Sequence, residues 1–448
     1  MAGSRPLRAL LVVGDIEFDE GEVRRRLSRA GLDADFVRVR DVLFRQPASL
    51  RAELPKDAEE IYDIIILPGS YPWNSSLVSP KAVKGAEGLG LLLDVLERFG
   101  VGVLRADRPV EKSRPDIVRA LAADTLARLR AAPELIPASP PPVRVMTEVT
   151  LEGDEDEGEL VRRAEEIVED GADVVVLAPL TDKAAERAPR LAARLRAATG
   201  APLGLDGAAD VQRACAGAVD VLLSARPAAL RSMGWAKGKY VVVLVDDDVD
   251  AAGEAVSEAA SLGLRPVLDP VLRPPIAPGL RGSLARLERL SGVPAPKMAG
   301  LSNALELMDA DTSGSAAMLL FLLAEYGVSA VLVEEASDKA RGLTAEARRA
   351  ADMASLAMVW SKPPKDVGVS LLNSKLKSLL VDAGGARLAP AGRSSVAVSV
   401  GGREVRVDCK EPCPLDRLAG LGLPARDLML LSIAVYRSCL PWSSAWTC

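Results

Sequence analysis

Eight short apolar segments recur at near-regular intervals in the middle of this chain, and no other feature restricts its fold as strongly. Most gaps between them hold amphipathic stretches, such as residues 157–171, with apolar side chains at helical spacing. The segments are residues 143–149, 173–179, 201–206, 219–224, 240–246, 264–269, 295–300 and 329–335. Continuous apolar strands that alternate with helices indicate a parallel sheet covered on both faces. Eight of them favour an α/β fold of the closed (β/α)8 TIM-barrel type over the alternative, an open doubly wound sheet.

The sequence on either side of this repeat predicts further domains. Residues 1–138 run strand, helix, strand and then a continuous β-branched stretch ending in Pro68-Gly69, which is typical of a small doubly wound, flavodoxin-like α/β domain. Prolines between residues 133 and 142 indicate a linker. We expect the barrel to occupy residues 143–378. Residues 380–448 alternate apolar and polar side chains around a Gly-Gly pair, which predicts a short C-terminal extension containing β-structure.

Charge and hydropathy argue against several classes of function. The 56 Lys and Arg against 62 Asp and Glu give a net charge of −6, and no basic cluster stands out, which argues against a nucleic-acid partner. No apolar stretch reaches about 18 residues without a charge or a helix breaker, so we expect no membrane span. Acidic residues follow the first apolar run at once, unlike in a signal peptide, and we expect a cytoplasmic protein.

Amide and imidazole side chains are scarce. The chain has no histidine, only three asparagines and only two glutamines. Poverty in thermolabile amides is reported for hyperthermophile proteins, so we expect a thermophilic source, although a GC-rich genome would give a similar bias toward Arg and Ala. Without histidine, no mechanism can use imidazole as a base, a proton shuttle or a metal ligand.

Acidic side chains close several of the predicted barrel strands. In β/α barrels the chemistry lies at the C-terminal ends of the strands. Asp206 and Asp269 each end an apolar strand at a position that points into the barrel mouth, where a carboxylate suits a ligand with adjacent N–H donors, such as an aminopyrimidinone ring. The alternative for such an Asp is an N-cap of the next helix. Asn303 is either a turn residue or, in a chain nearly free of Asn, a side chain with a specific polar task.

A run of three acidic residues, Asp246, Asp247 and Asp248, follows the fifth segment. Consecutive carboxylates cannot all face one ion. A solvated loop or a helix cap is therefore the stronger interpretation than a metal site.

Four of the five cysteines, Cys409, Cys413, Cys439 and Cys448, fall near the C-terminus. They could form a four-thiolate metal site, since a C-x3-C spacing lies within the range for zinc. Disulfides would fit a hyperthermophile. Free or buried thiols are the third alternative.

Several of these strings together resemble the pterin-binding barrel of dihydropteroate synthases. APLGLDGA places Asp206 where that family carries an Asp after its third strand, and RPVLDPV resembles the Asp-Pro after its sixth. Ser224 takes the place of an Asn-like donor on the fourth strand, and GLSN at 300–303 resembles the G-x-S-N of the pterin-binding methyltransferase branch. The resemblance implies a pterin pocket formed by Asp206, Ser224, Asp269, Ser302 and Asn303.

A closer resemblance is to the dihydropteroate synthase-like, or dihydropteroate synthase-related, proteins of archaea and bacteria. Their seventh-strand region carries G-N-x-T-E-L-x-D-x-D-S-x-G, which resembles GLSNALELMDADTSGS here. The aligned residues are Asn303, Glu306, Asp309, Asp311 and Ser313. Downstream, ASDKARGLTAEARRAADMA resembles the Ala-Arg-Ser helix start of that subgroup and implies an anion site at Arg341.

The chain departs from the dihydropteroate synthase pattern at several strands. Glu148 or Thr150 stands where the family has an Asn after the first strand, and Val176 where it has an acidic residue in the second. Leu301-Ser302-Asn303 replaces a Ser-Arg-Lys-like element, and Glu334-Glu335 stand where Arg and His hold pyrophosphate. A phosphate needs cations or helix N-terminal amides, and two glutamates would repel it. The candidate replacements for anion binding are Arg226, Arg273, Lys339 and Arg341.

The resemblance leaves three functions open. The first is a transferase of folate or methanopterin-type cofactor biosynthesis that joins a dihydropterin (pyro)phosphate ester to an arylamine, with Mg²⁺ accompanying the pyrophosphate. The second is a barrel that transfers a one-carbon (methyl) unit from a reduced pterin cofactor to an acceptor. The third is a non-catalytic pterin-binding or assembly protein, favoured by the missing acid and anion-binding residues. By analogy with the family, we expect a homodimer.

Overall fold

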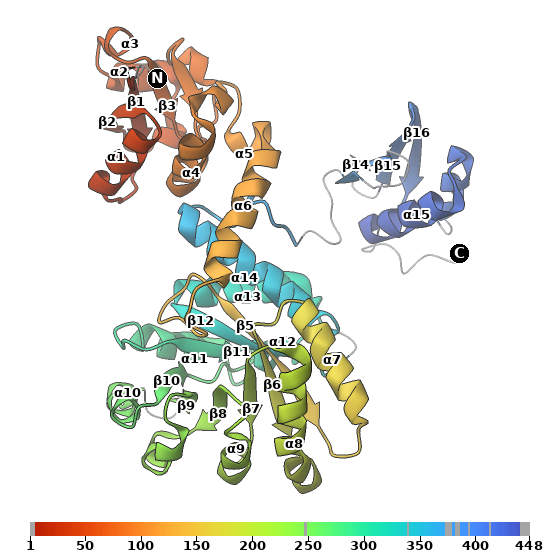
Figure 1. Cartoon of the computed structure of the whole chain (residues 1–448). Helices are drawn as coiled ribbons and strands as arrows, with labels where there is room; N and C mark the ends of the chain where they lie inside the picture. The colour runs from red at the N-terminus through yellow and green to blue at the C-terminus, as the bar shows by residue number, and fades with distance from the viewer. Residues whose placement is uncertain are drawn as a thin grey trace. The chain divides into compact units, whose positions relative to one another are not determined.

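The structure is a computed structural model of the whole chain (Figure 1). It describes residues 5–245, 249–337, 340–371, 379–380, 386–392, 395–411 and 414–439. The chain divides into two compact units, Met1–Ser370 and Leu371–Cys448. The first unit holds a four-stranded N-terminal sheet and a closed barrel, and the second holds a separate four-stranded sheet.

The N-terminal sheet has four parallel strands in the order β2-β1-β3-β4. The strands are β1 (Leu7–Val13), β2 (Leu32–Arg38), β3 (Ile64–Leu67) and β4 (Ala82–Lys84). The helices are α1 (Glu20–Arg29), η1 (Val42–Phe44), α2 (Pro47–Glu53), α3 (Ala58–Ile61), η2 (Ser75–Leu77), α4 (Leu89–Phe99), η3 (Val101–Val103), α5 (Val110–Ser113) and α6 (Pro115–Arg130). Leu11 and Ile66 pack into a core with α1, α4 and α6, whereas their neighbours Leu10 and Ile65 pack into a second core with α2 and α3. The central strands β1 and β3 are largely apolar because both faces of the sheet are buried there, whereas the edge strand β2 alternates buried and exposed residues at its start.

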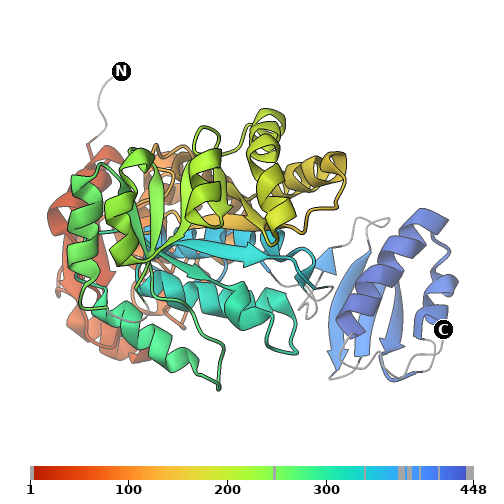
Figure 2. The ribbon, with the colours of Figure 1, turned by 90° about the horizontal axis from the view of Figure 1, so that it is seen from below.

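Eight parallel strands close into a barrel in sequence order, with β12 pairing back onto β5, which confirms the predicted (β/α)8 barrel. The strands are β5 (Arg144–Leu151), β6 (Val174–Pro179), β7 (Leu203–Asp206), β8 (Val221–Ala225), β9 (Tyr240–Leu244), β10 (Arg265–Asp269), β11 (Lys297–Gly300) and β12 (Val328–Glu334). The helical segments are α7 (Glu157–Glu169), α8 (Asp182–Thr199), α9 (Ala209–Cys215), η4 (Pro227–Ser232), η5 (Gly234–Ala236), α10 (Ala252–Ser261), α11 (Leu280–Arg289), α12 (Ser302–Leu305), α13 (Thr312–Glu325) and α14 (Leu343–Trp360). Figures 1 and 2 show the helices lying outside the strands.

Two apolar cores hold the barrel together. Met146, Val176, Val242 and Met298 fill its interior. Leu177, the neighbour of Val176, belongs instead to the core between the strands and the outer helices. Successive side chains of a strand point to opposite faces. Membership of one core or the other, as for Val176 and Leu177, therefore shows which residues of a strand face the barrel interior.

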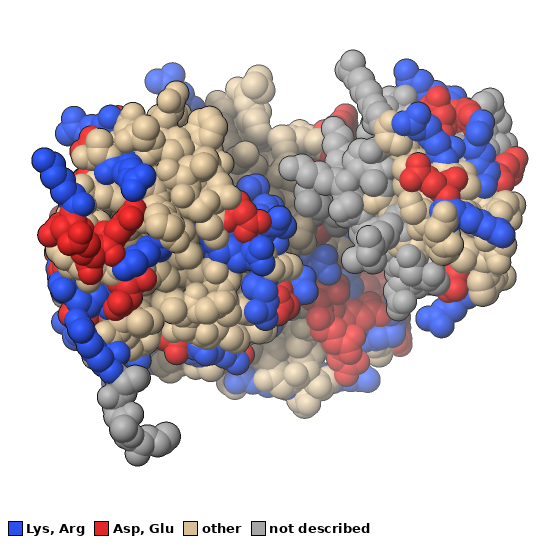
Figure 3. Space-filling view, turned by 90° about the horizontal axis from the view of Figure 1, so that it is seen from above, with Lys and Arg blue, Asp and Glu red and all other residues tan. Residues whose placement is uncertain are grey.

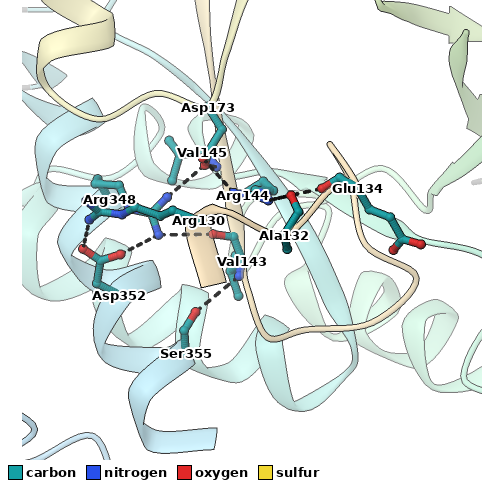
Figure 4. A network of polar contacts seen from close by, with 10 residues as sticks. All are labelled: Arg130, Ala132, Glu134, Val143, Arg144, Val145, Asp173, Arg348, Asp352 and Ser355. Atoms are coloured by element: carbon teal, nitrogen blue, oxygen red, sulfur yellow. Dashed lines mark hydrogen bonds and ion pairs between the residues drawn. The ribbon is translucent and has the colours of Figure 1, made fainter. Parts of the chain in front are cut away.

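A buried polar network joins the start of β5 to α14 (Figure 4). The Asp173 carboxylate lies 3.2 Å from Arg144 Nη1 and 2.9 Å from Arg348 Nη1, and accepts a 2.8 Å hydrogen bond from the Val145 amide. Arg348 also pairs with Asp352 at 2.7 Å, and Asp352 pairs with Arg130 of α6 at 2.7 Å. The network lies at the N-terminal end of the strands, so it fixes the barrel without occupying the mouth.

The last residue of α14 and the segment after it pack against the N-terminal part of the same unit. Trp360 Nε1 donates to Asp94 of α4 at 2.9 Å, and the buried Lys362 lies 3.0 Å from Glu111. Asp366 pairs with Lys112 at 2.7 Å, and Val367 is buried in the core that contains α4 and α6. These contacts explain why the unit ends at residue 370, inside the range of 143–378 predicted for the barrel.

The C-terminal unit is a four-stranded antiparallel sheet covered on one face by helices. Its elements are β13 (Leu379–Leu380), β14 (Arg387–Gly392), β15 (Ser395–Val400), β16 (Arg403–Asp408), η7 (Pro414–Leu421) and α15 (Ala425–Cys439). Gly401 and Gly402, both with positive φ, form the two-residue turn between β15 and β16. Cys409 and Cys439 form a disulfide. A sulfur in a disulfide is no thiolate ligand, so this pairing contradicts the four-thiolate alternative; Cys413 and Cys448 lie outside the described residues.

The surface drawn in Figure 3 carries Lys and Arg interspersed with Asp and Glu, separated by uncharged areas. None of the helices in the described ranges combines the length and the apolar character that crossing a bilayer requires.

Candidate functional site at the barrel mouth

Four strands carry a carboxylate at or near their C-terminal ends that points into the barrel. Met146, Val267 and Leu332 pack in the interior core, so Glu148, Asp269 and Glu334, each two residues further on, face the same way. A Cβ placed on Gly204 would lie 3.0 Å from Val176 Cγ2 and 3.2 Å from Leu223 Cδ1, which shows that Gly204 and hence Asp206 also face inward. We call Glu148, Asp206, Asp269 and Glu334 the mouth carboxylates.

Two of the mouth carboxylates have raised pKa values, and the pKa of Glu148 also responds to its acidic neighbours. Burial, followed by the charges of Asp206 and Glu334, raises the pKa of Glu148 to about 7. Burial also raises the pKa of Asp206. Glu148 and Glu334 lie side by side in the register of β5 and β12, which explains why their charges interact. A carboxyl group with a pKa near neutrality can both donate and accept a proton in the neutral range.

Three of the mouth carboxylates have no partner within the described ranges 5–245, 249–337 and 340–371. The side chains of Glu148, Asp206 and Glu334 form no hydrogen bond or ion pair with any residue described there. Buried polar groups in proteins are normally satisfied, so partly buried carboxylates without donors indicate a site for external N–H or O–H groups.

Asp269 and Ser302 are partly engaged by the chain itself. Asp269 Oδ1 accepts a 2.8 Å hydrogen bond from the Val271 amide, which holds the turn after β10. Ser302 Oγ accepts a 2.8 Å hydrogen bond from the Glu334 amide and lies 3.3 Å from the Glu334 carbonyl oxygen. Ser302 thus fixes the end of β12, and with it the direction of the Glu334 side chain.

Asn303 enters the mouth because β11 ends in glycine. Met298 faces the barrel interior, so the missing side chain of Gly300 would also point inward. A Cβ placed on Gly300 would lie 3.0 Å from Asn303 Nδ2. The amide of Asn303 therefore occupies the inward position that Gly300 leaves open, and adds a donor and an acceptor to the acidic mouth.

The other residues of the seventh-strand motif hold the surrounding helices. Ser337 Oγ donates to Glu306 Oε2 at 2.7 Å, Asp311 precedes α13, and Asp309 is exposed. Ser313 and its neighbour Thr312 both donate to Glu346 of α14. In this structure the motif links α12 and α13 to the segment that follows β12.

The described candidates for anion binding follow three different strands, β8, β10 and β12. Arg226 is exposed directly after β8, and Arg273 lies in the connection after β10, where its amide donates to Ser283 Oγ at 3.0 Å. Arg341 is exposed just before α14. Lys339 and the run of three aspartates at 246–248 lie outside the described residues.

The N-terminus of α14, the element next to Arg341, is already occupied by a carboxylate of the chain. Glu335 accepts hydrogen bonds from the Gly342 amide at 3.0 Å and from the Thr344 amide at 2.9 Å. Helix N-terminal amides are a common site for phosphate, and here Glu335 takes that place.

The remaining positions singled out by the sequence also have clear places. Ser224 lies in β8 at the irregularity of its pairing with β9. Val176 faces the barrel interior in register with Glu148 and Gly204. Sequence reasoning placed Glu148 and Glu334 at the ends of predicted strands and noted them as departures from a family pattern, but did not assign them to the pterin pocket. The alternation of side chains along β5 and β12 was the signal that could have placed them in the site.

A cavity of about 610 Å³ lies at the opposite end of the barrel, near the polar network of Arg144 and Asp173. In β/α barrels the N-terminal end of the strands serves stability rather than chemistry. The ion pairs that line this cavity fit that role.

Comparisons with known proteins give similarity without family membership. No protein-family model matches the chain. An uncharacterized protein of Methanocaldococcus jannaschii is 38% identical over 82 residues, which are 18% of this chain and 16% of that protein, so the match spans about a sixth of the relative.

Solved structures similar to the chain include dihydropteroate synthases from three bacteria. That from Vibrio fischeri is 16% identical over 49% of this chain and 94% of its own, with a TM-score of 0.41. Those from Stenotrophomonas maltophilia and Thermus thermophilus are 21% and 22% identical, each over 47% of this chain and over 90% and 92% of their own, with TM-scores of 0.38 and 0.35. The chain contains a closed parallel (β/α)8 barrel. The three solved structures named above, which are similar to this chain, are dihydropteroate synthases.

Proposed function

We propose that the barrel mouth binds a reduced pterin and that the protein is a dihydropteroate synthase-like transferase. The observation that carries this proposal is the set of inward-facing carboxylates, Glu148, Asp206 and Glu334, without partners in the described chain. The aminopyrimidinone ring of a pterin presents adjacent N–H and NH2 donors, which a carboxylate accepts in pairs. Asp206 and Asp269 are the residues we assign to the ring, and Asn303 to its remaining polar edge.

The reaction we propose joins a dihydropterin to an arylamine. The amine nitrogen forms a bond to the exocyclic methylene carbon, the bond from that carbon to the ester oxygen breaks, and the (pyro)phosphate leaves with the electron pair. The amine proton is taken up by a mouth carboxylate, for which Glu148, with a pKa of about 7, is suited. The protein contributes orientation and proton transfer rather than a covalent nucleophile.

The leaving anion would be held by Arg226 and Arg273, the described cations that follow β8 and β10. Glu335 already occupies the first amides of α14. Within the described ranges, no three Cys, Asp or Glu side chains are grouped so that they could hold a metal ion. We therefore derive no step from a protein-bound Mg²⁺.

One-carbon transfer from a bound pterin is the second candidate, and two observations on the acidic side chains of the site favour it. Acidic side chains at the mouth repel a pyrophosphate, and Glu335 fills the helix N-terminus that would bind one. A methylated tetrahydropterin carries no phosphate. Its methyl group would move to a nucleophilic acceptor, while Glu148 in its protonated form supplies the proton that the departing pterin nitrogen takes up.

The test is calorimetric titration of the full chain with 7,8-dihydropterin and with the pyrophosphate ester of its 6-hydroxymethyl derivative. Asp206→Asn and Asp269→Asn each remove a charged acceptor, so we expect affinity for both ligands to fall by about tenfold to a hundredfold. Asp210→Asn, an exposed aspartate of α9, is the matched control and should bind as the wild type does.

The pattern of affinities separates the candidates. Tighter binding of the ester supports the synthase reaction, and equal or weaker binding of the ester supports one-carbon transfer. Binding of either ligand that is unaffected by both Asn substitutions would contradict the assigned site. A wild-type protein that binds neither ligand would refute the pterin proposal altogether.

A further inference from the structure

A second cavity, of about 330 Å³, opens at the C-terminal edge of the N-terminal sheet, far in sequence from the barrel mouth. Its walls come from the ends of β1 and β3 and from the segments that follow β1, β2 and β4. Pockets for small molecules in proteins are typically roughly 300–1,000 Å³. The cavity is therefore large enough for a small organic ligand and too small for a helix of a partner protein.

Strand order explains why a cavity forms here. In the order β2-β1-β3-β4 the chain leaves β1 toward one side to form β2 and then returns to the other side to form β3. The connections that leave β1 and β3 therefore diverge, and a crevice remains between them. In open parallel sheets, ligands bind at this switch point.

The loop after β3 is held as a fixed wall. The Gly69 amide donates to the Ala86 carbonyl at 2.9 Å. A Cβ on Gly69 would lie 2.5 Å from the Ala86 carbonyl carbon, so only glycine permits this approach. Ser70, next in sequence, lies at the rim and is exposed.

The lining combines apolar walls with carboxylates. Val13, Leu67 and Leu92 belong to the walls. At the rim Phe44 and Ile16 are 84% and 45% exposed, which leaves apolar surface in water beside an open cavity. Burial of this surface by a ligand would release it from water.

The charged residues in the cavity wall are Asp15, Asp41 and Glu87, and among its described lining residues none is Lys or Arg. Asp15 accepts a 3.1 Å hydrogen bond from the Asp41 amide, and Glu87 lies 3.5 Å from Lys362 Nζ. Asp41 and Asp15 are exposed and face no cation in the cavity wall. A nucleotide phosphate at the rim would lie beside Asp15 and Asp41, two exposed carboxylates with no Lys or Arg among the described lining residues, whereas a cation would be attracted there.

We propose that this cavity binds a flat, largely apolar organic molecule without negative charge, with a preference for a positively charged ring system. The apolar walls and the exposed Phe44 supply contact with a ring, and Asp15 and Asp41 supply the preference for a cation. This site is separate from the barrel mouth and does not depend on the function proposed there.

Three probes of nearly the same shape test the charge preference. They are 9-aminoacridine, a cation at neutral pH, acridine, which is neutral, and acridine-9-carboxylate, an anion. We expect 9-aminoacridine to bind the full chain in calorimetric and fluorescence titrations and acridine-9-carboxylate to bind at least about tenfold more weakly. Equal binding of cation and anion, or no binding of any probe, would overturn the proposal.

Variants locate the bound probe. Ser70→Trp fills the rim and should weaken 9-aminoacridine binding by about tenfold or more, whereas Ser49→Trp, at an exposed serine of α2 outside the cavity, should not. Asp41→Asn suits the left-handed backbone of this residue (φ 54°) and should reduce the affinity for 9-aminoacridine but not for acridine. If Ser70→Trp and Ser49→Trp bind equally well, or if Asp41→Asn lowers both affinities alike, the probe does not occupy this cavity as proposed.

Discussion

Replacing Glu148 by Gln removes an ionisable carboxyl group, which is neutral in the folded protein at low pH. Its pKa of about 7 in the folded chain lies above the ordinary value of 4.5 because of burial and the charges of Asp206 and Glu334. The unfolded chain therefore releases this proton at lower pH than the folded chain does. The free energy of unfolding must fall as pH rises from about 4.5 to about 7, and the loss stays constant above that range.

The size of this effect follows from the same two values. A pKa moved from 4.5 to about 7 corresponds to about 3 kcal/mol. Glu148 is partly exposed, and solvent screening reduces that figure, so we expect about 1–3 kcal/mol. Glu148→Gln lacks the ionisation, so it should be more stable than the wild type at pH 8 by this amount, and the difference should shrink toward zero at pH 4.5.

Urea denaturation of the full chain at pH 5, 6, 7 and 8, followed by tryptophan fluorescence, measures this difference. Glu165→Gln, at an exposed position of α7, is the matched control, and its difference from the wild type should not vary with pH. If Glu148→Gln changes the free energy of unfolding by the same amount at pH 5 and pH 8, Glu148 does not titrate as the geometry of the mouth requires.

Three further changes give separate tests. Asp173→Asn leaves Arg144 buried without an anion and leaves Arg348 with Asp352 alone, and should lower the free energy of unfolding by about 3–5 kcal/mol in urea titrations, with Asp210→Asn as the neutral comparison. Gly300→Ala places a Cβ 3.0 Å from Asn303 Nδ2, so it should displace the Asn303 amide. We expect dihydropterin binding to weaken by about fivefold in calorimetry, while the urea midpoint stays close to that of the wild type. Unchanged affinity would show that Asn303 is not part of the site. Cys439→Ser opens a disulfide between cysteines 30 residues apart in sequence, which should destabilise the C-terminal unit by roughly 3 kcal/mol. Proteolysis of the C-terminal unit should become faster, while the barrel stays intact. Equal proteolysis rates for the variant and the wild type would contradict this expectation.

The barrel could be predicted from sequence because its signal is repeated eight times. Each strand is largely apolar and most connections contain a helix, so a local error in one segment does not change the count. The inward direction of Asp206 and Asp269 also follows from local alternation, since each ends a short strand whose previous inward residue is small or apolar.

The composition of the site depended on pairing between strands that are distant in sequence. Glu148 and Glu334 become neighbours only because β12 closes the ring against β5, and no local pattern reports that closure. The occupation of the α14 N-terminus by Glu335 depends on contacts between Glu335 and amides seven and nine residues further along the chain. The sequence motif there predicted an anion site at Arg341, and a motif cannot show that a carboxylate of the chain already fills the amides.

The cysteines show a different limit of sequence reasoning. Four cysteines allow several pairings, and spacing alone could not choose between a metal site and disulfides. The choice came from the fold of the C-terminal unit, which brings Cys409 at the end of β16 within 5.1 Å, Cα to Cα, of Cys439 at the end of α15.

The central claim is that unpartnered mouth carboxylates receive the N–H donors of a reduced pterin, and proton release on binding tests it most directly. Calorimetry of dihydropterin binding at pH 7, in phosphate and in Tris, yields the number of protons exchanged. N–H donors that reach the mouth lower the pKa of Glu148 from about 7. At pH 7 about half of the Glu148 carboxyl groups are protonated before binding, so up to about half a proton should be released in the wild type and none in Glu148→Gln. Binding without proton release, or the same release in both proteins, would contradict the account.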